Sequence, residues 1–106
     1  MDNSDIRVGF WYSRAEPDLP MPVEMPSPWP GQTDFVLGLS RVEGGLRQTR
    51  YRGFSMCRIC NRSNGSGEVE HAGFRWPSGL MHYVTAHNVR PDNDEFVALM
   101  QKRGRV

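Results

Sequence analysis

Four residues with metal-binding side chains stand out in this chain: Cys57 and Cys60, followed by His82 and His87. Their spacing, C-x2-C-x21-H-x4-H, supplies two thiolates and two imidazoles, the ligands that structural zinc sites arrange as a tetrahedron. Histidines five residues apart lie about 140° apart on an ideal helix, so we expect the helix to tighten or unwind before His87. The pattern therefore predicts zinc as a structural cofactor.

Other interpretations of these residues stay open from the sequence. A redox-active C-x-x-C pair would sit in a βαβ context, which the surrounding sequence does not show. His71 is a rival ligand, although it falls in a predicted hairpin. Four protein ligands leave no position for water, so we expect a closed site with no catalytic residue.

Arginines surround the cysteine pair. Residues 35–62 contain six arginines and one glutamate, while the whole chain has a formal net charge of +1. Arginine binds phosphate or carboxylate groups through two parallel hydrogen bonds, although a genome-wide preference for arginine is an alternative explanation. The expected binding surface comprises Arg50, Tyr51, Arg52, Arg58 and Arg62, with Phe54 and Trp76 as further stacking candidates.

Alternating apolar residues and turn signals predict the strands that position this site. We expect a strand over 6–12 and another over 48–54, directly before the cysteines. Residues 68–71 and 74–76, separated by Ala-Gly, predict a hairpin. The Ser-, Asn- and Gly-rich stretch 61–67 predicts a loop between the cysteines and that hairpin.

Three amphipathic segments predict helices over 33–47, 79–87 and 92–103. The second helix carries both histidines, with Ser78 as its expected cap. Asn88 follows the second histidine, and asparagine tolerates the left-handed conformation that ends a helix.

The segment 17–30 contains six prolines in fourteen residues, which excludes a helix or a central strand. We call it the proline-rich arm and expect it to be extended. Apolar residues recur along it, so we expect it to lie on its own domain. The alternatives are a clasp around a second subunit, giving a homodimer, or a ligand for a proline-recognition domain.

These elements predict one α+β domain over residues 1–106. It would be a small zinc-stabilised domain with a short antiparallel sheet, a zinc knuckle and about three helices, and residues 48–90 would form the zinc-binding unit. No apolar run approaches the roughly 18 residues of a membrane span, so we expect no membrane contact. The acidic, polar N-terminus is unlike a secretory signal, and a lone C-x-x-C fits a reducing cytoplasm.

Residues 50–98 resemble small bacterial proteins of unassigned function in which a C-x-x-C precedes a W-P-x-G-x-x-H-Y-V-x-x-H helix. The resemblance rests on the cysteine segment from Cys57, the segment from Trp76 through His87, and Asp94-Glu-Phe-Val. It implies a bacterial, cytoplasmic protein and supports His82 and His87 as ligands. It also implies that Trp76 and Tyr83 are packing residues around the metal.

Three functions fit these patterns. The first is a non-catalytic zinc protein that acts as a protein-interaction or adaptor module, for which the arm and the segregated charge provide the surface. The second is a zinc-finger-like nucleic-acid-binding protein that uses the arginine-rich flank of the cysteines. A remote third is a His-metal-finger nuclease, in which His71 would be the general base.

Overall fold

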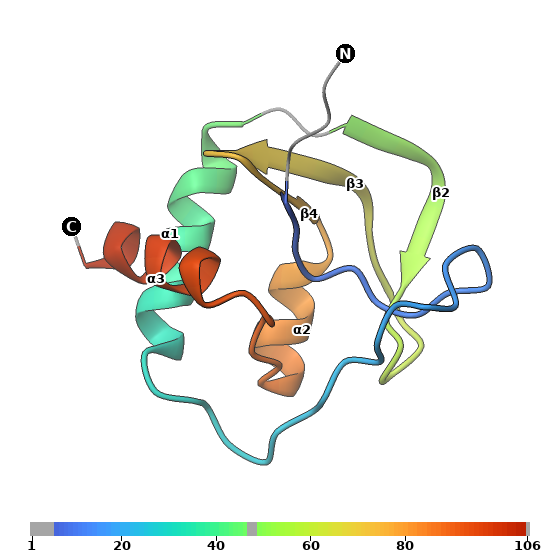
Figure 1. Ribbon diagram of the computed structural model, residues 1–106, viewed down its shortest axis with the longest axis horizontal. Coiled ribbons are helices and arrows are strands. Elements are labelled where there is room, and N and C mark those ends of the chain that lie inside the picture. Colours follow the sequence, from blue (N-terminus) through green and yellow to red (C-terminus); the bar gives the residue numbers. More distant parts are fainter. Residues whose placement is uncertain (1–5, 47–48, 106) are drawn as a thin grey trace.

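The computed structural model describes residues 6–46 and 49–105, with backbone alone for 49–54. Its helices gather on one side of a curled sheet (Figure 1), which confirms the predicted α+β class. The elements in chain order are β1 (Ile6–Arg7), α1 (Gln32–Gly44), β2 (Thr49–Met56), β3 (Ser63–His71), β4 (Phe74–Pro77), α2 (Leu80–His87) and α3 (Asp94–Gly104).

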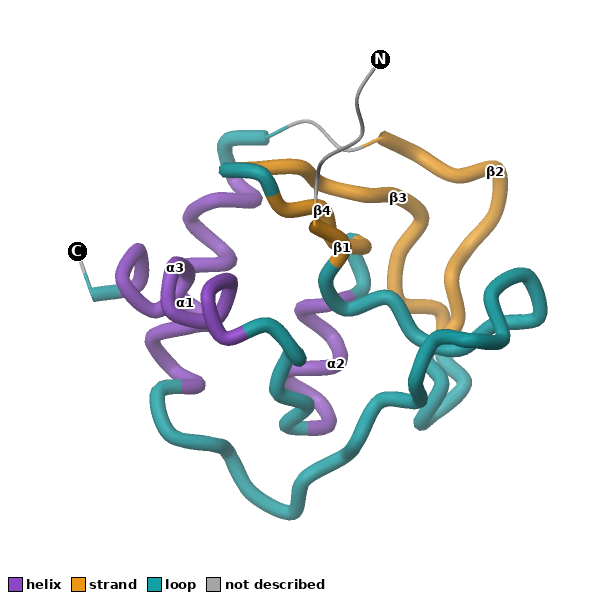
Figure 2. The backbone as a smooth tube through the Cα atoms, in the orientation of Figure 1, coloured by secondary structure: helices purple, strands orange, loops and turns teal. Residues whose placement is uncertain are grey.

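The sheet has the strand order β1-β4-β3-β2. β2, β3 and β4 pair antiparallel, as expected, but β1 pairs parallel with β4, with Ile6 opposite Phe74. Figure 2 shows this short strand beside β4. The sheet is therefore mixed, because the N-terminal segment joins its edge in the direction of β4.

Two strand predictions were wrong in extent. The predicted strand over 6–12 ends at Arg7, because Gly9 has a φ of 74° and turns the chain away from β4. Most of the predicted loop over 61–67, residues 63–67, instead belongs to β3, which pairs with β2 across a register shift. The hairpin was correct: Ala72 and Gly73 both have positive φ and connect β3 to β4.

The predicted helices exist, with different ends. α1 begins at Gln32, after Gly31 in a left-handed conformation, and ends at Gly44, short of the predicted residue 47, which lies outside the described residues. Ser78 does not cap α2, because its Oγ accepts a hydrogen bond from Gly67 N. The last helix starts at Asp94, where the Asn93 side chain accepts a hydrogen bond from Phe96 N.

The main core lies between the sheet and the helices. Phe96 of α3 is fully buried at its centre, and its ring centroid lies 5.1–5.8 Å from those of three other aromatic rings. These are Phe35, Phe74 and Trp76. Since Trp76 has no exposed surface, it stabilises the core and is excluded as a base-stacking residue.

Glu43 of α1 lies at the edge of this core, where its Oε2 accepts a 2.8 Å hydrogen bond from Trp76 Nε1. Burial raises the pKa of this carboxyl, and the hydrogen bond opposes that shift. The pKa of Glu43 is therefore higher in the folded chain than in the unfolded chain. Its contribution to the free energy of unfolding is complete below the unfolded pKa and is lost as the pH rises through the folded pKa.

We therefore expect Glu43→Gln, which keeps the acceptor and removes the charge, to melt at the same or a higher temperature than the parent at pH 7. The difference should vanish near pH 4, where the parent carboxyl is also neutral. The matched variant Glu43→Leu leaves Trp76 Nε1 unpaired and should melt lower at both pH values. Equal losses for both variants at pH 7 would contradict this account.

Candidate metal centre

The cysteines lie in a tight turn directly after β2, which we call the knuckle (residues 57–62). Asn61 N donates to Cys57 O at 2.9 Å, and Cys57 N donates to Arg62 O at 2.8 Å. Asn61 has a φ of 60°, a conformation that asparagine tolerates well. Ile59 N also points at Cys57 Sγ at 3.4 Å. The turn thus directs both thiols to the same side.

Both histidines come from α2. The helix continues through His87, and Asn88 ends it in the left-handed conformation with a φ of 54°. Unwinding thus follows His87 instead of preceding it, which corrects the sequence-based expectation. The two rings nevertheless lie 5.1 Å apart between centroids.

Cys57, Cys60, His82 and His87 lie close enough to hold one metal ion. Each offers one ligand atom, and these atoms all lie within 4.8 Å of one another. A tetrahedral zinc site, with metal–ligand distances of roughly 2.0–2.3 Å, spaces its ligand atoms roughly 3.3–3.8 Å apart. Cys60 Sγ and His82 Nε2 are 3.4 Å apart. Cys57 and His87 form the buried side of the site, and Cys60 is exposed.

Glu24 of the proline-rich arm orients His87. Its Oε2 lies 2.6 Å from His87 Nδ1, and this carboxylate partner assigns the proton to Nδ1. It also raises the pKa of His87. The other ring nitrogen, Nε2, is buried and makes no hydrogen bond of normal geometry. A carboxylate–histidine pair with a free second nitrogen is the arrangement that metal sites use, so the residues fit a metal.

Cys60 is prepared to bind as a thiolate. The neighbouring His87 ring is the largest cause, followed by the backbone N–H of Arg62, and together with weaker contributions they lower the pKa of Cys60 to about 6. A thiolate is the form that coordinates a metal. The histidines and the knuckle therefore favour the metal-binding state of this exposed thiol at neutral pH.

A second, small apolar cluster supports the buried side of the site. Cys57 packs there with Trp11, Tyr83 and Val89. Tyr83 Oη accepts a 2.8 Å hydrogen bond from Arg58 N, which connects α2 to the knuckle. The packing role implied for Tyr83 by the resemblance agrees with this position, whereas Trp76 belongs to the main core.

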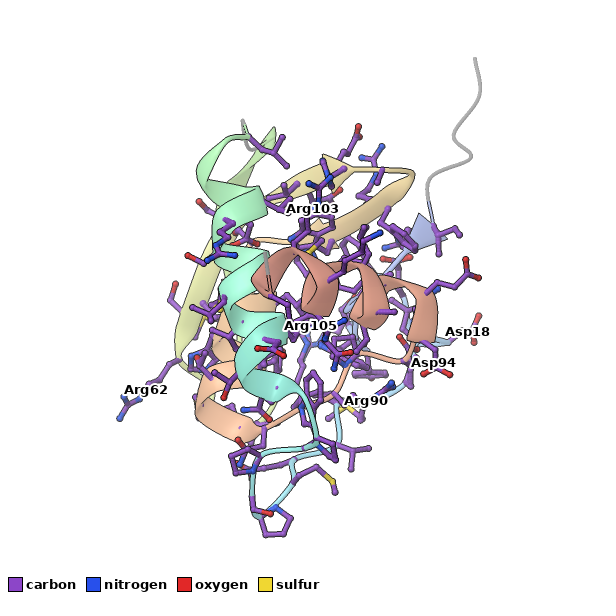
Figure 3. All side chains as sticks on the ribbon, turned by 90° about the vertical axis from the view of Figure 1, so that its left-hand side faces the viewer. Asp18, Arg62, Arg90, Asp94, Arg103 and Arg105 are labelled. Carbon is purple, nitrogen blue, oxygen red and sulfur yellow. The ribbon has the colours of Figure 1, made fainter. Side chains whose placement is uncertain are left out.

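The expected arginine surface is only partly described. Arg58 Nε donates to Tyr12 O at 2.6 Å, and its NH1 donates to Met56 O, so this side chain connects the knuckle to the N-terminal segment. Arg62 is exposed, and Figure 3 shows it projecting into solvent, apart from the other labelled arginines. The side chains of Arg50, Tyr51 and Arg52 lie outside the described residues.

His71 is not one of the four clustered residues. It lies at the end of β3 and lines a cavity of about 450 Å³ with residues of α1 and α3, including Val42 and Arg103. The structure thus separates His71 from the cluster, whose two histidines are His82 and His87.

Two contributors to this centre were missed by sequence reasoning. Glu24 precedes its partner by 63 residues, and no spacing rule connects them. Gln32 is buried and joins three segments: its Oε1 accepts from Trp29 N, and its Nε2 donates to Val84 O and Asn88 Oδ1. A glutamine at a helix start gives no signal of such a role.

We expect Glu24→Ala to weaken metal affinity by about 10–100-fold, because it removes the partner that orients His87. Competition with a chromophoric chelator measures the affinity. Asp18→Ala, which removes an exposed carboxylate from the same arm, is the matched control and should leave the affinity unchanged. Equal affinity of the Glu24 variant and the control would remove Glu24 from the metal centre.

Comparison with protein-family models, curated proteins and solved structures finds no match to this chain. Within residues 6–46 and 49–105, no helix is long and apolar enough to span a membrane.

Proposed function

We propose that this chain is a non-catalytic zinc protein that acts as a protein-interaction or adaptor module through its proline-rich arm. The proposal rests on the alternation of inward-facing and exposed side chains along that arm. Pro22 is buried and Glu24 contacts His87, whereas Met21, Val23 and Met25 are 53%, 68% and 44% exposed. Exposed apolar side chains on an ordered segment are typical of protein-binding surfaces.

The arm is held at several points along its length. Tyr12 N donates to Pro20 O at 2.9 Å, and Met25 N donates to His87 O at 3.1 Å. Trp29, near its end, is 8% exposed and belongs to the main core. Figure 1 follows the arm past the end of α2 to the start of α1. An extended segment that is already ordered binds a partner with a smaller entropy cost.

Zinc is the ion that this donor set favours. Two thiolates and two imidazoles match the ligands of structural zinc, and four protein ligands leave no open position for water. The two cysteines stay available as thiolates in a reducing compartment, so we place the protein in the cytoplasm. This location also fits the bacterial origin that the resemblance implies.

Nucleic-acid binding is the second candidate, favoured by exposed Arg62 beside the knuckle. Two other observations weaken it: Arg58 is engaged by backbone carbonyl groups, and Trp76 is buried. The nuclease alternative, in which His71 would be the general base, stays a remote third candidate, because the structure adds no observation in its favour.

A photo-crosslinking amino acid at position 23, introduced into the full chain in its native cells, tests the proposal. We expect a discrete adduct from position 23 and none from the matched control position 37, where Leu37 is 46% exposed on α1. An adduct of twice the chain mass would support a homodimer through the arm. Equal labelling from position 37, or no adduct from positions 21, 23 and 25, would refute the proposal.

Nucleic-acid affinity measured across a salt series separates the two candidates. Phosphate contacts give a steep fall of log affinity with log salt concentration. Under the protein-interaction proposal we expect no binding to duplex or single strands at about 50 mM salt, the low end of the series. Steep salt-dependent binding that Arg62→Glu abolishes would favour the nucleic-acid candidate.

A further inference from the structure

A cavity of about 450 Å³ lies where the C-terminal ends of α1 and α3 approach the end of β3. Figure 1 shows the end of β3 beside the C-terminal end of α1. The described residues that line the cavity are Arg41, Val42, Gly45, Leu46, His71 and Arg103. They include none of the four clustered residues of the candidate metal centre. Its volume is within the range of small-molecule sites, about 300–1,000 Å³.

The side chains that line the cavity are all accessible to solvent. Arg41 and Arg103 are exposed, and Val42, Leu46 and His71 are half-buried. A ligand in the cavity can therefore contact charged, hydrogen-bonding and apolar groups at the same time.

The wall of the cavity carries a positive charge. Arg41 and Arg103 contribute two full charges, and no carboxylate is among the described residues that line it. The C-terminal ends of α1 and α3 oppose them with about −0.5 each, so the sum is about +1. Arg41 NH1 donates to Arg103 O and Gly104 O, at 2.7 and 3.2 Å, which holds its guanidinium at the end of α3. The cavity therefore favours a ligand with a single negative charge.

Two polar groups at the cavity can bind that charge directly. The Arg103 guanidinium and the His71 ring make no hydrogen bond or ion pair with any residue that the structure describes. A guanidinium presents parallel donors that match the two oxygens of a carboxylate, and a neutral imidazole presents one N–H donor. A carboxylate supplies acceptors for both groups.

Val42 and Leu46 supply apolar surface next to these donors. Both pack against the main core, which fixes their positions, and both line the cavity. An apolar chain that covers them is removed from water, and this adds to the affinity in proportion to the area buried. Inorganic phosphate, which carries more charge and no apolar part, matches this wall less well.

We propose that this cavity binds a monocarboxylate with a short apolar chain, its carboxylate held by Arg103 and His71 and its chain lying on Val42 and Leu46. The proposal goes beyond the protein-interaction function and does not depend on the arm or its partner. A free carboxylic acid and the C-terminus of a peptide share this chemistry, and the experiment distinguishes these two sources.

Titration of the metal-loaded full chain with hexanoate, acetate and hexanol, followed by amide NMR shifts, tests this assignment. We expect saturable shifts at cavity residues with hexanoate, at a Kd of about 1 mM. Acetate lacks the chain and hexanol lacks the charge, so each should bind at least about tenfold more weakly. Arg103→Gln should raise the Kd of hexanoate about tenfold. Lys102→Gln removes an exposed charge from the neighbouring position of α3, outside the cavity, and should leave that Kd within about twofold.

The tripeptide acetyl-Ala-Ala-Leu separates the two sources. Binding that is tighter than that of hexanoate and is lost when the C-terminus is amidated identifies a peptide terminus, whereas equal or weaker binding identifies a free acid. Melting temperature and metal content verify that each variant is folded. His71→Phe, which keeps a ring and removes the N–H donor, should raise the Kd about threefold, and it replaces Arg103→Gln if the latter is not folded.

Three results would overturn the proposal. The first is no saturation by hexanoate up to about 20 mM, about twenty times the expected Kd. The second is equal affinity for hexanol and hexanoate, which would show that the charge is not recognised. The third is an unchanged Kd in folded Arg103→Gln.

Discussion

Chelation of the metal, or Cys57→Ser, is expected to remove the cooperative folded state of this chain. Apparent binding energies of structural zinc, about 10–16 kcal/mol, equal or exceed typical domain stabilities of about 5–15 kcal/mol. The ion would join the knuckle after β2 to α2, and through His87 and Glu24 it would also hold the arm. The apolar cluster around Cys57 is too small to replace that connection.

Thermal unfolding followed by circular dichroism, with and without chelator, measures this effect. His71→Gln is the matched control: it replaces the third histidine of the chain, which lies outside the metal cluster. The control should keep the melting temperature and metal content of the parent, while His82→Gln and His87→Gln should lose both. A metal-free chain that melts cooperatively at the parent temperature would contradict this prediction.

Gly38→Ala is expected to cause the second large loss, because α1 and α3 cross with their backbones in contact. A Cβ at Gly38 would overlap Met100 O, and one at Gly104 would overlap Asp34 O. Neither obstacle is a side chain that can rotate away. Overpacking of this kind costs about 1–3 kcal/mol or more, which lowers the Tm of a domain this size by about 4–8 °C for each kcal/mol.

Gly44→Ala is the matched control in the same helix, since no atom lies within 4 Å of the Cβ it would add. Alanine is favoured over glycine in a helix by up to about 1 kcal/mol, so this variant should melt at or above the parent temperature. Similar melting temperatures for the Gly38 and Gly44 variants would show that the helices can separate to admit a methyl group.

The four clustered residues of the candidate metal centre were predictable because their signal is local. Each pair is separated by a few residues, and ligand chemistry restricts the residue types. The helix carrying His82 and His87, and the left-handed Asn88 that ends it, follow from patterns within one or two turns. The proline-rich arm was likewise recognisable, and the burial of Pro22 and Trp29 confirms that it lies on its own domain.

The missed features depend on partners distant in sequence. Residues 63–67 have the composition of a loop, yet they pair because β2 offers an adjacent edge. Gly9 fits the alternating pattern of a strand, and only its left-handed conformation in the folded chain shows that the strand ends before it. Glu24 becomes part of the metal centre only because the arm passes the end of α2, where Met25 N bonds to His87 O. Such contacts are set by the tertiary fold and not by local pattern.

X-ray absorption at the zinc edge, combined with metal analysis of the purified full chain, tests the central claim most directly. We predict one zinc per chain, bound by two sulfur atoms at about 2.3 Å and two nitrogen atoms at about 2.0–2.1 Å, with no water ligand. Loss of the bound zinc in Cys60→Ser and in His82→Gln, but not in the His71→Gln control, would assign these ligands individually. Less than about half an equivalent of zinc, or a first shell containing water in place of either histidine, would contradict a closed site.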